Sequence, residues 1–201
     1  MKSKVIGLIA ILTISMSPLA SADKTVLAGG CFWCMESDFE KVPGVQDVIS
    51  GFTGGTAPSP TYNGDHTGHY EAVEITYDPA VVSYEDLLRH YWVNVDPFDD
   101  RGQFCDKGHS YLSAIFVSNS TERNLAEATS QQVMALFPDQ KIVTPILDSS
   151  RFYPIMGDES YHQDYYKNNP GRYKLYRWSC GRDARLAEIW GELASRSLPD
   201  S

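Results

Sequence analysis

The segment KTVLAGGCFWCMESDFEK, residues 24–41, decides how the fold begins, because a strand pattern changes to a helix pattern within it. Residues 24–28 form a short apolar run that predicts a strand. Two glycines then make a tight turn, and a helix is expected over residues 32–41. Cys31 therefore lies at the start of a helix, and Cys34 follows it three residues later.

The rest of the chain continues to alternate between strand and helix patterns. Residues 70–77, YEAVEITY, alternate strictly and predict a strand. Ser83 and Asp86 have the spacing of a capping box, so a helix is expected through the following YEDLLRHYWVN. Further strands are expected at residues 45–52, 111–118 and 143–147, and further helices at residues 121–137, 161–167 and 184–195.

The first six elements run strand, helix, strand, strand, helix, strand. This order is typical of the split β-α-β plan, in which helices pack on one face of a sheet. We therefore expect a two-layer α+β, ferredoxin-like domain with extra C-terminal helices and long irregular segments. The Gly- and Pro-rich residues 51–68 form the longest irregular segment, and long loops in compact domains are commonly functional.

Length and composition favour one domain with a full core. The chain has 201 residues, of which 42% are apolar and 21% charged. The formal net charge is −9, and no basic run appears, which disfavours a nucleic-acid-binding function.

The N-terminus has the pattern of a secretory leader. Lys2 and Lys4 precede an apolar run over residues 5–16, and Ala20 and Ala22 mark a small-x-small cleavage site. The run is shorter than the ~20 residues that a membrane-spanning helix needs, which disfavours an uncleaved anchor. We expect residues 1–22 to be removed as a signal peptide. Residues 23–201 would then form a single exported catalytic domain, periplasmic or secreted, without stable membrane association.

Export affects the interpretation of the four cysteines, which are Cys31, Cys34, Cys105 and Cys180. An even number of cysteines outside the cytoplasm often indicates structural disulfides. This chain is large enough to fold without disulfides, so a redox role of the cysteines is kept as an alternative. The start of a helix favours a thiolate at Cys31, although a buried cysteine can also serve only as a small apolar residue.

Glu71 is the most informative acidic residue. Side chains alternate along a strand, so Glu71 shares the apolar face of Val73, Ile75 and Tyr77. A carboxyl group on that face would lose water, its pKa would rise, and it could act as a general acid near neutral pH. Its place at the start of the strand is equally compatible with a solvated edge residue.

Other polar residues are less specific. Asp106 precedes Lys107 and Gly108 in a turn-like sequence, and Tyr111 could belong to the core. The five histidines lack the cysteine-rich partner runs of a zinc site. A zinc site at Cys31 and Cys34 would need two distant ligands, and His162 is interpreted as a packing or hydrogen-bonding residue.

Four sequence blocks, taken together, resemble the type A methionine sulfoxide reductases, which are specific for the S epimer of the sulfoxide. These blocks are GGCFW at residues 29–33, GHYEAVEITYDP at residues 68–79, QFCDKGHSYLSAIF at residues 103–116 and YHQDYYKNNP at residues 161–170. The resemblance implies an oxidoreductase that acts without a bound metal, flavin or nicotinamide. Its substrates would be oxidised proteins or peptides that carry methionine sulfoxide, and the chain is expected to be a monomer.

The resemblance also implies roles for individual residues. Cys31 would attack the sulfoxide sulfur and become a sulfenic acid, and Phe32 and Trp33 would hold the S-methyl group. The other implied residues act on the sulfoxide oxygen or hold the site by hydrogen bonds: Glu71 as the acid, Tyr62 and Tyr111 as polarising hydroxyls, and Asp106.

A second thiol must then convert the sulfenic acid to a disulfide. Many family members carry glycine at the position of Cys34 and use cysteines in a C-terminal tail, but this chain has no cysteine after Cys180. The resolving thiol is therefore Cys34 or Cys180, with Cys105 less favoured. Cys34 is preferred because its loop to Cys31 is the shortest. An external dithiol, thioredoxin or a thioredoxin-like protein, would reduce the product.

Two other functions are compatible with parts of the sequence. A thioredoxin-like disulfide oxidoreductase would explain a strand, a CxxC motif and a helix in this order. It would leave the acid at Glu71 unexplained. A structural or metal-binding domain with two disulfides would explain the even number of cysteines in an exported chain.

Overall fold

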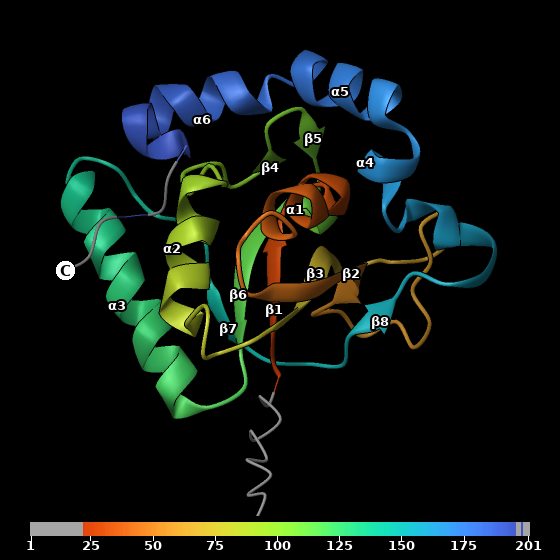
Figure 1. The fold of residues 1–201 in the computed structure, drawn as a ribbon, viewed down its shortest axis with the longest axis horizontal. Helices are drawn as coiled ribbons and strands as arrows, with labels where there is room; N and C mark the ends of the chain where they lie inside the picture. The colour runs from red at the N-terminus through yellow and green to blue at the C-terminus, as the bar shows by residue number, and fades with distance from the viewer. Residues whose placement is uncertain (1–21, 196–197, 199–201) are drawn as a thin grey trace, which may run out of the picture.

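A six-stranded sheet forms the centre of the structure, a computed structural model that describes residues 22–195 and residue 198 (Figure 1). The strand order is β7-β6-β1-β3-β2-β8. Neighbouring strands are antiparallel except for the parallel pair of β6 and β7. The strands are β1 Asp23–Gly29, β2 Val45–Thr53, β3 Tyr70–Tyr77, β6 Ser113–Val117, β7 Ile146–Asp148 and β8 Tyr153–Pro154. The expected α+β class is confirmed.

The predicted leader, residues 1–22, lies outside the described residues except for its last position. Among the residues that the structure describes, none of the helices has the length and apolar character needed to cross a membrane.

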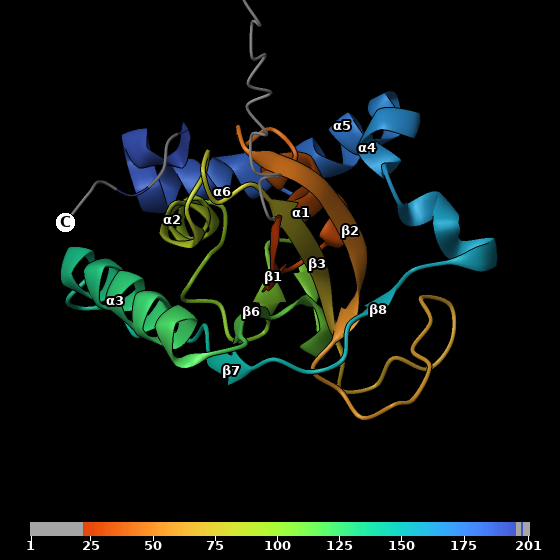
Figure 2. The ribbon, with the colours of Figure 1, turned by 60° about the horizontal axis from the view of Figure 1, so that its bottom comes forward.

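One face of the sheet forms the main core. Leu27 of β1, Val73 and Ile75 of β3 and Ile115 of β6 are fully buried on this face. Three helices cover it and contribute their apolar side chains to the same cluster: α1 Phe32–Phe39, α2 Tyr84–Val93 and α3 Ser120–Leu136. Figure 2 shows these helices on one side of the strands.

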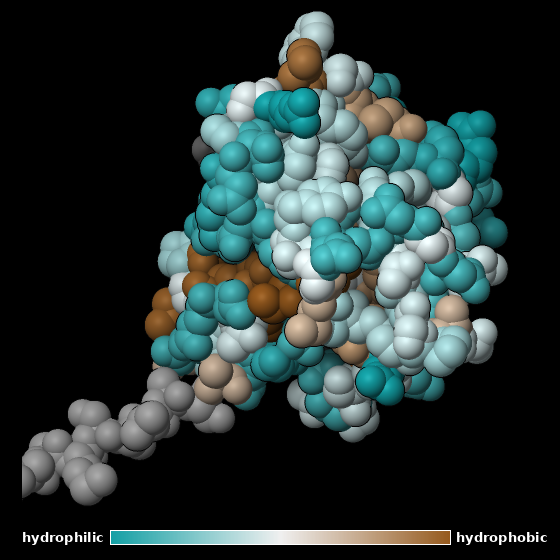
Figure 3. Space-filling model, turned by 90° about the vertical axis from the view of Figure 1, so that its right-hand side faces the viewer, coloured by the Kyte–Doolittle hydropathy of each residue, from teal (hydrophilic) through white to brown (hydrophobic). Residues whose placement is uncertain are grey.

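The other face of the sheet carries a smaller cluster of alternate residues, including Ala28, Ala72 and Phe116. The segment from β7 to β8 crosses this side of the sheet (Figure 2). A groove of about 590 Å³ lies beside it, lined by Ile49, Glu74, Phe152, Pro154, Ile155, Met156 and Gln163. Figure 3 views the molecule from the side of β8 and shows one recessed apolar patch on a mostly hydrophilic surface.

The helix starts follow from local capping. Ser83 and Asp86 form the predicted capping box at the start of α2, each side chain accepting the backbone N–H of the other residue. The helix α3 begins one residue before the predicted Thr121, because the side chain of Asn119 accepts the N–H of Glu122 at 2.9 Å.

The C-terminal third differs most from the expectation. The predicted helix over residues 161–167 is a 3₁₀ turn, η2 Gly157–His162, followed by α4 Tyr165–Asn168. Asp164 separates them because its backbone is left-handed, with φ 53°. The sequence analysis missed α5 Pro170–Ser179 entirely. The last predicted helix is α6 Arg182–Trp190 with a 3₁₀ turn, η3 Gly191–Ser195.

A short hairpin, also not predicted, lies beneath α5 and α6. Its strands are β4 Gly102–Gln103 and β5 Asp106–Lys107, and the turn η1 His109–Tyr111 follows. The predicted strand over residues 111–118 therefore begins later, at Ser113. Figure 1 shows α5 and α6 passing across the end of the molecule above the hairpin. This arrangement brings the C-terminal helices close to the start of α1.

Candidate active site

A small cavity of about 60 Å³ lies at the start of α1. Its lining includes every residue that the sequence analysis linked to the sulfoxide group or its attacker: Cys31, Phe32, Trp33, Tyr62, Glu71, Asp106 and Tyr111. Tyr176 of α5 completes the lining. The structure therefore joins residues from a helix start, a long loop, a strand, a hairpin and a 3₁₀ turn.

Cys31 and Cys34 lie together as free thiols beneath this cavity. Cys31 is the N-cap of α1, and its carbonyl oxygen accepts the N–H of Cys34 at 3.1 Å. The two residues are only 7% and 2% exposed, respectively. The cavity is therefore the route by which a small group reaches the Cys31 sulfur.

The two thiols have opposite pKa shifts. Burial raises the pKa of Cys31 well above its ordinary value, and the charges of Cys34 and Glu71 raise it further. A hydrogen bond from Cys31 lowers the pKa of Cys34 to about 7, with Arg182 and Arg177 adding to this effect. The prediction of a lowered pKa at Cys31 is therefore wrong for this state. The first negative charge of the pair lies on Cys34.

The two arginines are held near Cys34 by a shared carboxylate. Arg177 donates to Asp38 at 2.9 and 3.0 Å, and the Nε atom of Arg182 lies 3.7 Å from Asp38. Arg182 also donates to the backbone carbonyl oxygens of Gly29 and Asn94. It is thus fixed between the end of β1 and the end of α2.

Glu71 of β3 lies on the predicted apolar face and is 2% exposed, which excludes the solvated-edge alternative. One of its carboxyl oxygens accepts the backbone N–H of Phe32 at 3.2 Å. Burial raises the pKa of Glu71 to about 8, although this hydrogen bond opposes the shift. The carboxyl group is therefore protonated near neutral pH and can donate a proton into the cavity.

Two tyrosine hydroxyls lie beside this carboxyl group. Tyr111 hydrogen-bonds to Glu71, and burial raises the pKa of Tyr62 to about 12, with the Glu71 charge adding to the shift. Both phenols remain protonated donors at physiological pH. The backbone N–H groups of Tyr62 and Asn63 donate to the Glu159 carboxylate at 2.8 Å each, which holds this part of the long loop.

An aromatic wall closes one side of the cavity. The Trp33 ring stacks on Tyr165 with 3.8 Å between ring centroids. Its indole N–H donates to His162 at 3.0 Å, so His162 has the packing and hydrogen-bonding environment expected from the sequence. The Phe32 ring lies 6.1 Å from those of Phe52 and Tyr62. The wall is apolar and fixed in orientation.

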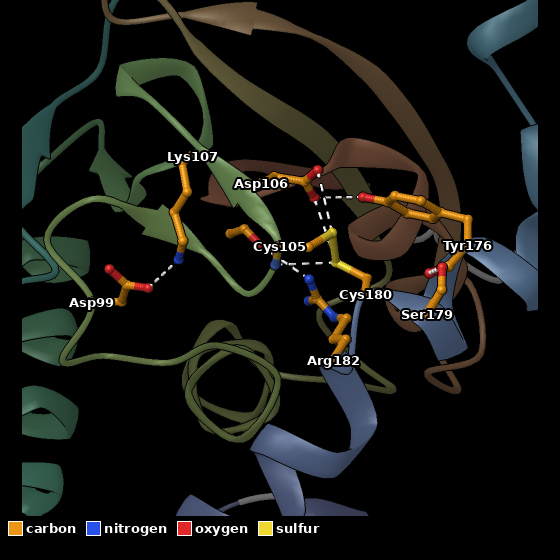
Figure 4. The surroundings of a disulfide bond; sticks show 9 residues. Asp99, Cys105, Asp106, Lys107, Tyr176, Ser179, Cys180 and Arg182 are labelled. Carbon is orange, nitrogen blue, oxygen red and sulfur yellow. Dashed lines mark hydrogen bonds and ion pairs between the residues drawn. A yellow bond between two sulfur atoms is a disulfide. The ribbon is translucent and has the colours of Figure 1, made fainter.

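Asp106 and Tyr176 form the side of the cavity nearest to the C-terminal helices. The Tyr176 hydroxyl donates to the Asp106 carboxylate, and burial raises the pKa of Asp106. Figure 4 shows both side chains beside a disulfide bond between Cys105 and Cys180. The sequence analysis missed Tyr176, and its only signal was an aromatic residue one helical turn before Cys180.

The two cysteines predicted as candidates for the resolving thiol have different environments. Cys34 is beside Cys31, whereas Cys180 is bonded to Cys105, and the sequence did not indicate this pairing. Within the described residues, three carboxylates are close enough to share a cation: Glu36, Glu40 and Asp164. The Lys167 ammonium group already lies 2.6 Å from both Glu40 and Asp164, which makes this cluster an ion-pair network.

Glu36 is a buried acid that the sequence analysis also missed. It lies in α1, on the helix that carries both free thiols, and accepts the N–H of Asp164 at 2.9 Å. Burial raises its pKa to about 8. Its contacts anchor α1 to the start of α4.

Together these groups suit one kind of reaction. A buried thiol faces a protonated carboxyl group and two phenols, which can stabilise charge that develops on an oxygen atom. An apolar aromatic wall lies beside them and can receive a small alkyl group. The arrangement can transfer an oxygen atom from a soft atom of the substrate to the sulfur of Cys31.

Comparison with known proteins identifies the family of this chain. Residues 23–194 match the family described as peptide methionine sulfoxide reductase. Peptide methionine sulfoxide reductase MsrA 2 of Caulobacter vibrioides is 48% identical over 181 residues, covering 87% of this chain and 90% of that protein. MsrA of Bacillus subtilis is 47% identical over 169 residues, covering 82% and 93%.

Solved structures agree with this comparison. Methionine sulfoxide reductase A of Corynebacterium diphtheriae has a TM-score of 0.65 and 30% identity, covering 79% of each chain. Mxr1 of Saccharomyces cerevisiae in reduced form has a TM-score of 0.67 and 26% identity, covering 79% of this chain and 91% of that one. A structure of Mxr1 in complex with Trx2 has the same fold, with a TM-score of 0.51 and 19% identity.

Proposed function

The chain belongs to the peptide methionine sulfoxide reductase family, and from this premise we propose which of its residues perform each step. It is a type A, thiol-dependent enzyme that reduces methionine sulfoxide and so repairs oxidised proteins. The observation that carries the assignment of steps is that Cys31 and the protonated Glu71 line the same closed cavity.

In the first step, the sulfur of Cys31 attacks the sulfoxide sulfur. Cys34 has the lower pKa of the pair and is the thiolate, so it can accept the Cys31 proton along their hydrogen bond as the new bond to the substrate sulfur forms. Glu71 protonates the sulfoxide oxygen, and the hydroxyls of Tyr62 and Tyr111 stabilise its developing charge. The S-methyl group lies against Phe32 and Trp33, and Asp106 holds the substrate side by hydrogen bonds.

The oxygen atom thus moves from methionine to Cys31. Methionine leaves, and Cys31 becomes a sulfenic acid. Cys34 then attacks this sulfur, water leaves, and a Cys31–Cys34 disulfide forms. The free state of Cys34 beside Cys31 supports this choice over Cys180, whose sulfur is already bonded to Cys105.

A thioredoxin-like dithiol is proposed to reduce the enzyme after each turnover. The yeast relative Mxr1 is known in complex with Trx2, which supports this type of reductant. The proposal includes export of the mature chain from residue 23, action as a monomer and no bound cofactor. The leader pattern in the sequence supports the export.

The two alternative functions are less well supported. A thioredoxin-like oxidoreductase is not favoured, because the family match spans residues 23–194. A structural domain with two disulfides does not account for the free thiols of Cys31 and Cys34.

The test is an assay of the mature chain with dithiothreitol and each sulfoxide epimer of a methionine-containing peptide. We expect methionine from the S epimer and none from the R epimer. Activity on neither epimer, or equal activity on both, would contradict the assignment.

A further inference from the structure

Tyr62 is the one group of the cavity that comes from a long irregular loop. This loop, residues 54–69, joins β2 to β3 and contains no helix or strand. The Tyr62 hydroxyl must nevertheless lie within hydrogen-bonding distance of the sulfoxide oxygen to stabilise its developing charge. A misplacement of about 1 Å can lower a rate ~10²-fold, so the backbone of Tyr62 needs a fixed position.

Other contacts of the loop leave this backbone position to be fixed by a different group. At the start of the loop, the N–H of Gly54 donates to the Ser150 hydroxyl at 2.9 Å. Within the loop, the His66 ring hydrogen-bonds to the carbonyl oxygen of Thr61 at 2.9 Å. These contacts hold the entry of the loop and close it on itself, but neither engages the N–H of Tyr62.

The carboxylate of Glu159 contacts the backbone at Tyr62 directly. Its Oε2 atom accepts the N–H of Tyr62, and its Oε1 atom accepts the N–H of Asn63, each at 2.8 Å. The side chain of Asn63 also donates to this carboxylate. Partial burial raises the pKa of Glu159, but the hydrogen bonds from Asn63 and Tyr62 outweigh it and lower the pKa overall. Glu159 is therefore charged at neutral pH, and hydrogen bonds to a charged acceptor are the strong ones.

Glu159 itself stands on a fixed base. It belongs to η2, and the turn is followed directly by Gln163, whose side chain bonds to β2. The Gln163 amide accepts the N–H of Ser50 at 2.9 Å and donates to the carbonyl oxygens of Ser50 and Ile155 at 2.7 and 3.0 Å. The loop of Tyr62 lies beside this part of the chain (Figure 2). The position of Glu159 is thus set by the same sheet that carries Glu71.

The Tyr62 side chain extends from this contact into the cavity. Its ring centroid lies 4.0 Å from that of His162 and 6.1 Å from that of Phe32. The ring contacts fix the rotation of the side chain, and the Glu159 contact fixes the backbone from which it extends. Both are needed to place the hydroxyl beside Cys31 and Glu71, which line the same cavity.

We propose that Glu159 is a positioning residue for the oxygen transfer. Its carboxylate fixes the backbone of residues 62 and 63, so that the Tyr62 hydroxyl meets the sulfoxide oxygen. The inference rests on the proposed function, in which Tyr62 stabilises charge on that oxygen, and it assigns a role to a residue that the sequence analysis did not single out. Glu159 acts through Tyr62 and does not touch the substrate.

The contact contributes little to the stability of the whole domain. Glu159 is only half-buried, and charged groups near the surface contribute little to the free energy of unfolding. Without Glu159, the N–H groups of Tyr62 and Asn63 can donate to water instead. The loss should therefore appear in the rate of methionine formation, while the urea midpoint of Glu159→Ala stays near that of the wild type.

The test is a double-mutant cycle on the first half of the reaction. Enzyme with its native disulfide is mixed with methionine (S)-sulfoxide peptide without reductant, and the rate of methionine formation is measured in a single turnover. Tyr62→Phe should lower this rate by about 10²-fold, as expected for loss of one hydrogen-bond donor to the oxygen. Glu159→Ala should lower it by about 10-fold, because a misplaced hydroxyl keeps part of its effect.

The double variant Tyr62→Phe/Glu159→Ala decides whether Glu159 acts through Tyr62. Its rate should equal that of Tyr62→Phe within about twofold, because the hydroxyl that Glu159 positions is already absent. A double variant about 10-fold slower than Tyr62→Phe would overturn the inference, since two independent effects add in free energy. Asp158→Ala, which removes an exposed acid one residue earlier in the same turn, is the matched control and should keep the wild-type rate.

The outcomes separate the inference from the proposed function. A wild-type rate in Glu159→Ala or in Tyr62→Phe would overturn the inference, and the proposed function would stand on the methionine that the wild type forms. No methionine from the wild type would overturn the proposed function.

A second pair of variants tests the same contact by a gain of rate, which misfolding cannot imitate. Asn63→Asp places a second carboxylate against Glu159, and the repulsion between like charges should displace the loop and slow methionine formation. Glu159→Gln should slow the wild type, because the amide has one acceptor oxygen for two N–H groups. In the Asn63→Asp background the same change removes the repulsion, so it should raise the rate. A lower rate from Glu159→Gln in both backgrounds would overturn the inference.

Discussion

The two pairs of cysteines in this protein differ in almost every physical property. Cys31 and Cys34 are free, buried and held at the start of one helix. Cys105 and Cys180 are bonded, accessible and separated by 75 residues. The buried pair lies beside a protonated acid and an aromatic wall, whereas the surface pair joins the β4–β5 hairpin to the end of α5 and lies beside Asp106.

Burial determines which chemistry each pair of cysteines can perform. In the cavity, loss of water raises the pKa of Glu71 and strengthens every hydrogen bond to the substrate oxygen. At the surface, the Cys105–Cys180 bond fastens the end of α5 to the β4–β5 hairpin.

The largest effect is expected from Cys31→Ser. A serine hydroxyl cannot accept the oxygen of the sulfoxide, so the variant should form no methionine. Cys34→Ser, the matched control within the pair, should form one methionine per chain from enzyme with the native surface disulfide, because Cys31 alone accepts the oxygen. It should do so more slowly than the wild type, because Cys34 takes up the Cys31 proton in the first step. Its Cys31 should then be a sulfenic acid that reacts with dimedone. Methionine formation by Cys31→Ser would contradict the assignment of the nucleophile.

Glu71→Gln should lower kcat/KM by about 10²-fold or more, because a well-placed general acid contributes ~10²–10⁴-fold. The wild-type rate should fall as the pH rises through about 8, where Glu71 loses the proton that it donates. The variant has no such proton, so this loss should disappear from its pH profile. The same fall near pH 8 in the variant would assign the titration to another group.

Loss of the surface disulfide should lower stability. The disulfide closes a loop of 75 residues, and such a bond typically contributes ~2–4 kcal/mol to the free energy of unfolding. Urea denaturation of Cys105→Ser/Cys180→Ser should show this loss. Adding dithiothreitol should lower the wild-type midpoint and leave the variant unchanged. An effect of dithiothreitol on the variant would mean that another bond is responsible.

A smaller effect on stability is expected from Glu36, which is buried in the helix of the catalytic pair. Its pKa is about 8 in the folded protein and near the ordinary value of 4.5 in the unfolded chain. The folded state therefore binds more protons between these values, so stability falls as the pH rises from 4.5 to 8. Glu36→Gln should reduce this fall by about 1 kcal/mol or more. If the melting temperature of Glu36→Gln had the same pH dependence as that of the wild type, a group other than Glu36 would bind the extra proton of the folded state.

The sequence predicted the elements whose local signals are strong. Strict alternation predicted β3 at its observed bounds, and the Ser83–Asp86 spacing predicted the start of α2. The face of Glu71 followed from the same alternation. These predictions depend only on period and capping, which are properties of a few neighbouring residues.

The features that the sequence did not predict depend on contacts between residues that are distant along the chain. The pairing of Cys105 with Cys180 cannot be derived from sequence, because four cysteines allow three connectivities. The place of Tyr176 in the cavity depends on how α5 crosses the molecule. The pKa of Cys34 is lowered first by its hydrogen bond with Cys31 and then by Arg182 and Arg177, and both arginines lie more than 140 residues away along the chain.

The most direct test of the central claim, that the buried pair performs the chemistry, is a disulfide map after turnover. Enzyme with its native disulfide is mixed with methionine (S)-sulfoxide peptide without reductant, its remaining thiols are blocked, and its peptides are identified by mass. The account predicts that Cys31 is bonded to Cys34 and Cys105 remains bonded to Cys180. A peptide joining Cys31 to Cys180, with Cys34 blocked as a free thiol, would contradict it.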